Sequence, residues 1–367
     1  MKSKKIHVLF ASRAYESPQS EGGFVLLRDL AREFSESKDF QATFFSAGAA
    51  NDSGVEMLKI YQKVGWGDRC RLEFLLAILR HQSRFDIVHI AHVPTLINVK
   101  FMKFVSKLGK RSHVRYIQTI TAIPKTPKET LHQLFWGDKI ICQTNETLET
   151  VLREGLDPVL ISPRIPPARV RFDQVRRRQT RKFRFSSFSK VIVYPGEYDR
   201  LGIDETFSIF IRKVLSEIAN SCVVLACRFD ESRVGENIIM DCSEDYPGRV
   251  FSMMEIDWIV DLLEAADLVV FPARSMEGKF QPPLVLLEAL ALGRKVLVSE
   301  AVDLPKHFHS HLVYRASAMN FLEFANAAIN CIRDLPDEGP VSDSIYEFDD
   351  MVERYQEIYL ELANREL

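Results

Sequence analysis

Glycine and arginine residues of this sequence stand at positions that suit an anionic ligand. Gly22 and Gly23 precede a segment with helical spacing, where small residues let a ligand approach backbone amides. Arg200 and Arg228 follow two apolar, strand-like segments, and the guanidinium fork of arginine matches phosphate oxygens. The plainer interpretation is a flexible loop and two surface arginines, so the rest of the chain must decide between them.

Apolar segments that alternate between strand and helix patterns must position these residues. Strand-like segments cover residues 6–11, 42–46, 85–90, 114–118 and 139–143, and then 190–194, 223–226, 249–251, 268–271 and 295–299. Helical spacing covers residues 24–34, 99–108, 146–154, 204–219, 256–265, 283–292 and 351–363. This alternation predicts an α/β protein with two Rossmann-like, doubly wound domains, whose ligands bind at the carboxyl ends of the strands.

The domain boundary is expected where prolines and charge interrupt the pattern. The segment PRIPP, residues 163–167, is followed by an arginine-rich stretch up to Arg184. Prolines and charge without apolar periodicity are typical of a linker. We therefore predict an N-terminal domain over residues 1–165, a basic linker over 166–188, a C-terminal domain over 189–345 and a final helical segment over 346–367.

Composition excludes several classes of protein. The 367 residues suit two domains, and the formal net charge of −2 argues against a nucleic-acid binder. Six cysteines form no CxxC pair or Cys/His cluster, which favours buried thiols over a zinc site or disulfides. The first apolar run is interpreted as a strand and not as a signal peptide, and no run reaches the roughly 18 to 20 apolar residues that span a bilayer. These features predict a cytoplasmic protein.

The most specific signal in the sequence covers residues 266–299, ADLVVFPARSMEGKFQPPLVLLEALALGRKVLVS. This segment resembles the donor-site signature of GT-B glycosyltransferases, in particular retaining glycosyltransferase family 4. Five further segments resemble parts of that family in the same order: EGGFVLLRDLAREF, DIVHIAHVPT, WGDKIICQTNETLETVLREG, YPGEYDRLGIDE and MVERYQEIYLELAN. The resemblance implies the GT-B fold, with two domains facing a central cleft and the final helix packed back on the first domain.

The resemblance also assigns roles to particular residues. Glu288 occupies the second glutamate of the family's Glu-x7-Glu motif, where a carboxylate accepts hydrogen bonds from both ribose hydroxyls of the donor. The alternative, an exposed helix residue, is disfavoured by its apolar neighbours. The other candidates are Arg200, Glu277 and Lys279 for catalysis; Gly22, Gly23, Gly196, Arg228, Phe280, Pro283 and Leu284 for donor binding; and His92 and Thr121 for acceptor binding.

We expect neither a metal site nor a cofactor, because GT-B enzymes generally stabilise the departing diphosphate with basic side chains and helix N-termini. The sequence contains no Asp-x-Asp triplet, the metal motif of the alternative fold. Within the apolar segment that contains His89, we expect that histidine to be packed or hydrogen-bonded. His92 lies nearer the following loop, which is why it is the acceptor candidate.

Several positions depart from the family pattern. The first glutamate of the motif is replaced by Phe280, although Glu277 and Lys279 are near enough to substitute. The usual Gly-Arg is Gly196-Glu197, the usual Lys-Gly is Leu201-Gly202, and a histidine common in the first domain is Thr121. These changes leave the sugar identity open and permit a catalytically silent relative.

The function that we expect is transfer of a hexosyl-type sugar from a nucleotide diphosphate sugar to a hydroxyl of a carbohydrate or lipid-linked acceptor, with retention of configuration. The rival is a silent GT-B subunit that binds a glycan or a partner protein. A nucleotide-sugar 2-epimerase is disfavoured, because its acid–base set is not recognisable. The stretch Arg164–Arg184 is either a solvated linker or a patch for anionic lipid headgroups or a phosphorylated acceptor, which would make the protein peripheral at the inner membrane face.

Overall fold

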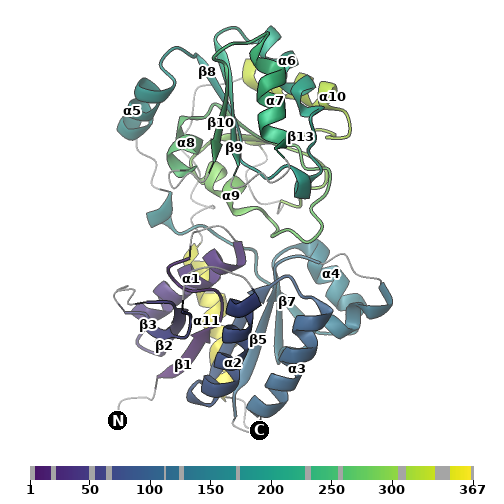
Figure 1. Ribbon diagram of the computed structural model, residues 1–367. Helices are drawn as coiled ribbons and strands as arrows, with labels where there is room; N and C mark the ends of the chain where they lie inside the picture. The colour runs from purple at the N-terminus through teal and green to yellow at the C-terminus, as the bar shows by residue number, and fades with distance from the viewer. Residues whose placement is uncertain are drawn as a thin grey trace. The chain divides into compact units, whose positions relative to one another are not determined.

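The computed structural model divides into two compact α/β units, each shown as a ribbon in Figure 1. It describes residues 5–17, 22–48, 54–62, 68–110, 113–123, 128–170, 174–227, 233–254, 259–304, 311–334 and 348–364. Unit 1 consists of Met1–Pro163, Glu277–Gln281 and Asp349–Leu367, and unit 2 of Arg164–Met276 and Pro282–Phe348. A short loop and the final helix, both distant in sequence, therefore belong with the N-terminal unit.

The described residues of unit 1 form a seven-stranded parallel sheet in the order β3-β2-β1-β4-β5-β6-β7. Its strands are β1 (Ile6–Phe10), β2 (Phe40–Ser46), β3 (Glu56–Lys59), β4 (Ile87–His92), β5 (Arg115–Ile120), β6 (Lys139–Cys142) and β7 (Pro158–Leu160). The helices are α1 (Gly22–Glu36), α2 (Asp68–His81), α3 (Leu96–Lys110), α4 (Asn145–Arg153) and α11 (Phe348–Asn364). Strand order reverses between β1 and β4, which makes the carboxyl ends of these two strands the expected ligand position.

Helices cover both faces of this sheet. On one face, Leu9 and Val88 pack with Ile78 of α2 and Val105 of α3 in a single buried cluster. On the other face, Phe10 packs against Phe34 of α1 and Tyr359 of α11, with ring centroids 5.6 and 6.3 Å away. The final helix is therefore an integral layer of unit 1, because its aromatic side chains complete the core there.

The described residues of unit 2 form a six-stranded parallel sheet in the order β10-β9-β8-β11-β12-β13. Its strands are β8 (Lys190–Tyr194), β9 (Ser221–Cys227), β10 (Val250–Met254), β11 (Leu268–Phe271), β12 (Lys295–Val298) and β13 (Val313–Arg315). The helices are α5 (Gln174–Arg184), α6 (Phe207–Glu217), α7 (Val234–Ser243), α8 (Ile259–Ala265), α9 (Leu284–Ala291) and α10 (Phe321–Arg333). Strand β11 is buried along its whole length, as expected for a parallel strand with helices on both sides. The switch point of this sheet lies between β8 and β11.

At three places an aspartate just before one strand accepts a hydrogen bond from a backbone N–H of the neighbouring strand. Asp86 precedes β4 and accepts a hydrogen bond from the backbone N–H of His7 at 2.8 Å. Asp138 precedes β6 and accepts one from Tyr116 at 2.8 Å. Asp267 precedes β11 and accepts one from Val191 at 2.7 Å. Each carboxylate thus satisfies a strand-end amide at the amino edge of its sheet, opposite the expected ligand edge.

Most predicted elements are confirmed, with shifted ends, and the strands at 190–194 and 268–271 have the predicted bounds. The sequence patterns did not predict β3, α2, β7, α7, β13 or α10. The stretch predicted as a basic linker contains α5, while Ile165 and Val170 just before it are buried in the core of unit 2. Arg181 holds α5 through Asp267 and through the carbonyls of Phe188 and Ser189.

Candidate functional site

Glu288 lies in the second turn of α9, the helix that follows switch-point strand β11. Pro283 stands just before the helix and accepts the backbone N–H of Leu286 at 3.0 Å, and Leu284 is its first residue. The glutamate is 2% exposed, so it is not the solvent-exposed helix residue of the alternative interpretation. Its Oε1 lies 2.6 Å from a guanidinium nitrogen of Arg169. A buried carboxylate near the ligand edge of the sheet can accept hydrogen bonds from a polar ligand.

Gly196, one of the predicted donor-binding residues, lies in the loop after β8, and packing within that loop accounts for the glycine without any ligand. A Cβ added to Gly196 would lie 2.7 Å from the ring of Tyr194, and the Tyr194 hydroxyl donates to the Glu197 carbonyl at 2.6 Å. Any larger side chain at position 196 would clash with the Tyr194 ring, so a glycine is required there. The backbone of Arg200 belongs to a short 3-10 helix (Asp199–Leu201), but its side chain lies outside the described residues, as does the whole of Arg228.

Sequence reasoning missed Arg274, which follows β11 at the ligand edge of unit 2. Its guanidinium lies 2.7 Å from Asp204 Oδ2, donates to the Gly202 carbonyl at 3.2 Å, and stacks 4.4 Å from the ring centroid of Phe321. These contacts hold in place the loop that contains Leu201 and Gly202, which stand where the family usually has Lys-Gly. Arg274 lies within the donor-like segment 266–299, and its place in that segment is the one sequence signal that could have drawn attention to it.

The loop Glu277–Gln281 packs on the ligand edge of unit 1. The amide of Gly278 donates to the Ile123 carbonyl at 3.2 Å, and that of Gln281 donates to the Thr121 carbonyl at 3.1 Å. The side chain of Gln281 reaches Glu146 on α4 at 3.5 Å. Gln281 was not among the predicted site residues. Glu277 is exposed and Lys279 half-buried in the same loop.

Phe280 and Gly22, which were predicted separately as donor residues, lie together in unit 1. A Cβ built on Gly22 would lie 2.3 Å from the Phe280 ring, at the first residue of α1. Gly23 is less tightly confined, because its Cβ would lie 3.1 Å from the Ala91 carbonyl oxygen and 3.3 Å from Thr121 Cγ2. Gly22 is therefore needed for close packing within the unit, and Gly23 packs closely as well, which is a reason for these glycines besides ligand approach.

Gly22→Ala is expected to lower the free energy of unfolding by about 1–3 kcal/mol, since the added methyl group overlaps the Phe280 ring. Chemical denaturation of the purified protein measures this loss. In the double variant Gly22→Ala/Phe280→Ala the overlap is gone, so adding Gly22→Ala to Phe280→Ala should cost much less. If Gly22→Ala lowered the free energy of unfolding equally in wild type and in Phe280→Ala, the Phe280 ring would not be in contact with Gly22.

The two histidines of the β4 segment have different surroundings. His89 is fully buried between Tyr359, 2.5 Å from Nδ1, and Thr119, 2.7 Å from Nε2, which confirms the packed, hydrogen-bonded role. His92 ends β4 and stacks on Trp136 at 6.5 Å. Both ring nitrogens of His92 are buried, and neither has a hydrogen-bond partner in the structure as described.

Burial lowers the pKa of His89 to about 3 and that of His92 to about 4, so both imidazoles are neutral at pH 7. A neutral imidazole offers one hydrogen-bond donor and one acceptor. His92 thus presents an unused pair of polar atoms at the carboxyl end of β4, the position at which a ligand of this sheet is expected.

Three further properties bear on the candidate site. Within the described residues, no group of three or more His, Cys, Asp or Glu side chains could hold a metal ion. None of the helices that the structure describes combines the length and apolar character that crossing a bilayer requires. All six cysteines are buried thiols.

Solved structures of other proteins share this architecture over nearly the whole chain. Anabaena Alr3699/HepE, crystallised with UDP and glucose, matches with a TM-score of 0.73 and 12% identity over 97% of this chain and 100% of its own. A glycosyltransferase from Rickettsia africae matches with a TM-score of 0.68 and 11% identity over 99% and 100%. WaaG, a glycosyltransferase involved in lipopolysaccharide biosynthesis, matches with a TM-score of 0.59 and 12% identity over 98% of both chains.

No protein-family model matches the sequence, and neither does any curated protein. At 11–12% identity the structural likeness shows the fold alone. That fold is GT-B, with two Rossmann-like parallel-sheet domains, and the fold class predicted from the sequence is thereby confirmed. Membership of glycosyltransferase family 4 stays a prediction.

Proposed function

We propose that this protein is a glycosyltransferase that takes a sugar from a UDP-sugar and transfers it to a hydroxyl of a carbohydrate or lipid-linked acceptor. The observation that carries the proposal is Glu288, a buried carboxylate on the helix after switch-point strand β11. Its position suits acceptance of hydrogen bonds from the two ribose hydroxyls of a nucleotide. Support also comes from the matching fold of HepE, whose crystal structures contain UDP and UDP-glucose.

The proposed reaction needs stabilisation of the negative charge that develops on the departing diphosphate. Arg200 and Arg228, in the loops after β8 and β9, are the proposed phosphate contacts, with Glu277 and Lys279 near the sugar. His92 is the proposed acceptor contact, since its neutral ring can both donate to and accept from a hydroxyl group. We place the reaction in the cytoplasm, with retention of configuration, a hexosyl-type sugar and neither metal nor cofactor.

Glu288→Gln is expected to weaken UDP binding by about 10- to 100-fold, because each ribose hydroxyl loses a charged acceptor. Calorimetric titration with UDP and UDP-sugars measures the change. Glu264→Gln is the matched control: Glu264 is also a buried glutamate of unit 2, 1% exposed, but lies on α8 near the opposite edge of the sheet. Equal UDP affinity of Glu288→Gln and wild type would contradict the proposed donor site.

A second candidate function is a silent GT-B subunit that binds a glycan or a partner protein. The observation that favours it is Phe280, which replaces the family's first glutamate and packs on Gly22. An assay for nucleoside diphosphate release, run over common donors with and without acceptors, separates the two. Turnover with any donor supports the enzyme, whereas binding of no nucleotide sugar at all supports the silent subunit.

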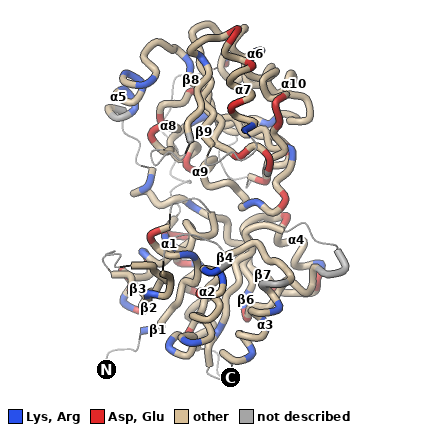
Figure 2. Tube along the Cα trace, viewed as in Figure 1, with Lys and Arg blue, Asp and Glu red and all other residues tan. Residues whose placement is uncertain are grey.

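Peripheral contact with an anionic membrane is the proposed role of the exposed face of α5. Val175 and Phe183 are 62% and 80% exposed, and Arg178 and Lys182 lie exposed between them at helical spacing. Figure 2 shows the basic residues along this helix. Apolar side chains flanked by positive charge suit a negatively charged lipid surface.

Arg178→Ala/Lys182→Ala is expected to weaken binding to phosphatidylglycerol vesicles by about 1 kcal/mol for each charge removed. Vesicle flotation measures the bound fraction. Arg153→Ala, which removes an exposed arginine of α4 that pairs with Glu149, is the control and should float like wild type. Flotation of the wild type that does not depend on anionic lipid would remove the membrane proposal.

A further inference from the structure

The ion pair between Arg169 and Glu288 joins two segments of unit 2 that are far apart in the sequence. Arg169 ends a short 3-10 helix (Pro167–Arg169) whose position is fixed on both sides, because Ile165 and Val170 are buried in the unit 2 core. Its guanidinium lies 2.6 Å from Glu288 Oε1, with side-chain exposures of 18% and 3%. The backbone of the arginine is therefore anchored in unit 2, and its side chain lies against a carboxylate that solvent scarcely reaches.

Stability alone does not account for such a pair. Removing two charges from water costs about as much as their attraction returns, and an apolar pair of similar volume stabilises a core at least as well. A lone carboxylate at 2% exposure would be strongly penalised, however, and would not keep its charge. The neighbouring guanidinium thus supplies the positive charge that a buried carboxylate needs at this place.

We propose that Arg169 is a positioning residue for nucleotide binding. It keeps Glu288 charged and oriented so that ribose hydroxyls meet a ready acceptor, and it contacts no phosphate group. The inference rests on the proposed function, since it concerns the same carboxylate. It adds that an arginine near the start of unit 2, outside the donor signature, controls the ribose contact.

The test compares Arg169→Gln, Glu288→Gln and the double variant in titrations with uridine, UMP and UDP. If Arg169 acts through Glu288, Arg169→Gln weakens all three ligands by the same factor, about 10- to 100-fold. The double variant then binds no more weakly than Glu288→Gln, because the two losses are one and the same. Arg169→Lys keeps the charge but not the fork, so it recovers part of the affinity.

Arg181→Gln is the control for a general loss of stability. Arg181 pairs with Asp267 at 2.8 Å, with exposures of 20% and 11%, at the amino edge of the same sheet. This variant should unfold more easily than wild type yet bind the three ligands unchanged when folded. Thermal unfolding of each variant defines the temperature at which all of them are folded for the titrations.

The outcomes separate this inference from the proposed function. A loss in Arg169→Gln that grows from uridine to UDP shows direct phosphate contact and overturns the positioning role. Unchanged affinity in Arg169→Gln, or additive losses in the double variant, overturn it as well. Failure of the wild type to bind any of the three ligands overturns the proposed function and the inference together.

Discussion

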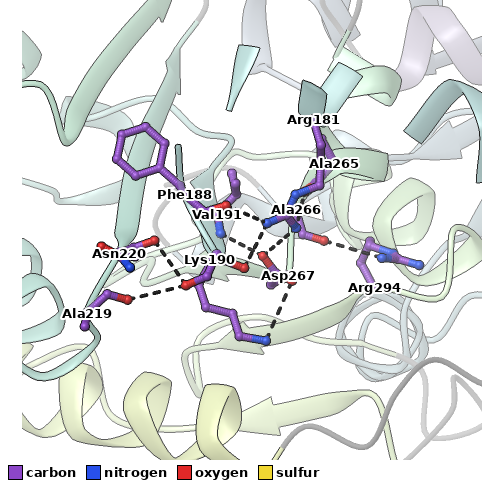
Figure 3. Close-up of polar contacts among 11 residues, drawn as sticks. Arg181, Phe188, Lys190, Val191, Ala219, Asn220, Ala265, Ala266, Asp267 and Arg294 are labelled. Atoms are coloured by element: carbon purple, nitrogen blue, oxygen red, sulfur yellow. Dashed lines mark hydrogen bonds and ion pairs between the residues drawn. The ribbon is translucent and has the colours of Figure 1, made fainter. Parts of the chain in front are cut away.

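Asp267→Ala is expected to lower the free energy of unfolding by about 3–5 kcal/mol, the largest effect of a single substitution that we predict. Figure 3 shows the contacts of this carboxylate. Asp267 accepts the backbone N–H of Val191 at 2.7 Å and pairs with Arg181 at 2.8 Å, while Lys190 lies 4.0 Å away. Its removal leaves a strand-end amide without its acceptor and deprives the Arg181 guanidinium of its negatively charged partner, although the carbonyls of Phe188 and Ser189 still accept from that guanidinium.

The surroundings of Asp267 increase this cost. Burial, followed by the nearby positive charge of Arg177, lowers the pKa of Arg294 to about 10, and the negative charge of Asp267 opposes that shift. Without the aspartate, three arginines crowd one edge of the sheet with less compensation. The same network anchors α5, so that helix should detach first in the variant.

Urea denaturation of Asp267→Ala beside Asp241→Ala provides the measurement. Asp241 also pairs with an arginine of unit 2, Arg212, at 2.9 Å, but the two side chains are 42% and 47% exposed. Exposed pairs contribute about 0–1 kcal/mol, so the control should lose little. Similar losses of unfolding free energy in both variants would mean that burial does not increase the contribution of the Asp267 pair to stability.

Acid is expected to destabilise unit 1 through His89 and His92. An unfolded histidine has a pKa of about 6.5, whereas burial lowers the folded values to about 3 and about 4. The unfolded chain therefore takes up protons more readily. The contribution of these histidines to stability is fully present above about pH 6.5 and is lost as the pH falls toward the folded pKa values.

The size of the effect follows from the same shifts. At pH 5 a histidine with a strongly lowered pKa costs about 2 kcal/mol of unfolding free energy, because 1.36 kcal/mol corresponds to one pKa unit. The neighbours of His89, Tyr355 and Tyr359, stay neutral throughout, since burial raises their pKa values. Denaturant midpoints measured between pH 4 and pH 8 test this slope.

His89→Phe removes one titrating group from the core. The variant is expected to be less stable at pH 7, because the bonds to Tyr359 and Thr119 are lost, but its stability should depend less on pH. His132→Gln, a change at an exposed histidine of the same unit, is the control and should keep the wild-type slope. A His89→Phe profile parallel to that of wild type would rule out His89 as a source of acid sensitivity.

Apolar patterns predicted much of the scaffold because they report burial directly. Strands such as Leu268–Phe271 are buried on both faces, so their sequence is apolar throughout and their bounds are clear. Helix α2 was missed because Leu72 and Leu76 are exposed, at 57% and 54%, and blur its amphipathic stripe. Helix α5 was missed because arginine contacts, and not an apolar stripe, attach it to the sheet.

For the candidate site as well, the sequence marked some residues, whereas other contacts are seen only in the structure. The motif alone marked Glu288 and the loop after β11, and the order of strands placed Arg200 and Arg228 in the loops after β8 and β9. No local pattern could show that Arg169 would pair with Glu288, or that Phe280 would rest on Gly22.

By itself, the sequence determined the two-domain α/β architecture and the segments whose ends face a ligand, because both follow from the local alternation of apolar residues. The tertiary structure decided which charges meet and which glycines are needed for packing. Those contacts join residues from distant parts of the chain, and their geometry exists only once the sheets and helices have packed together.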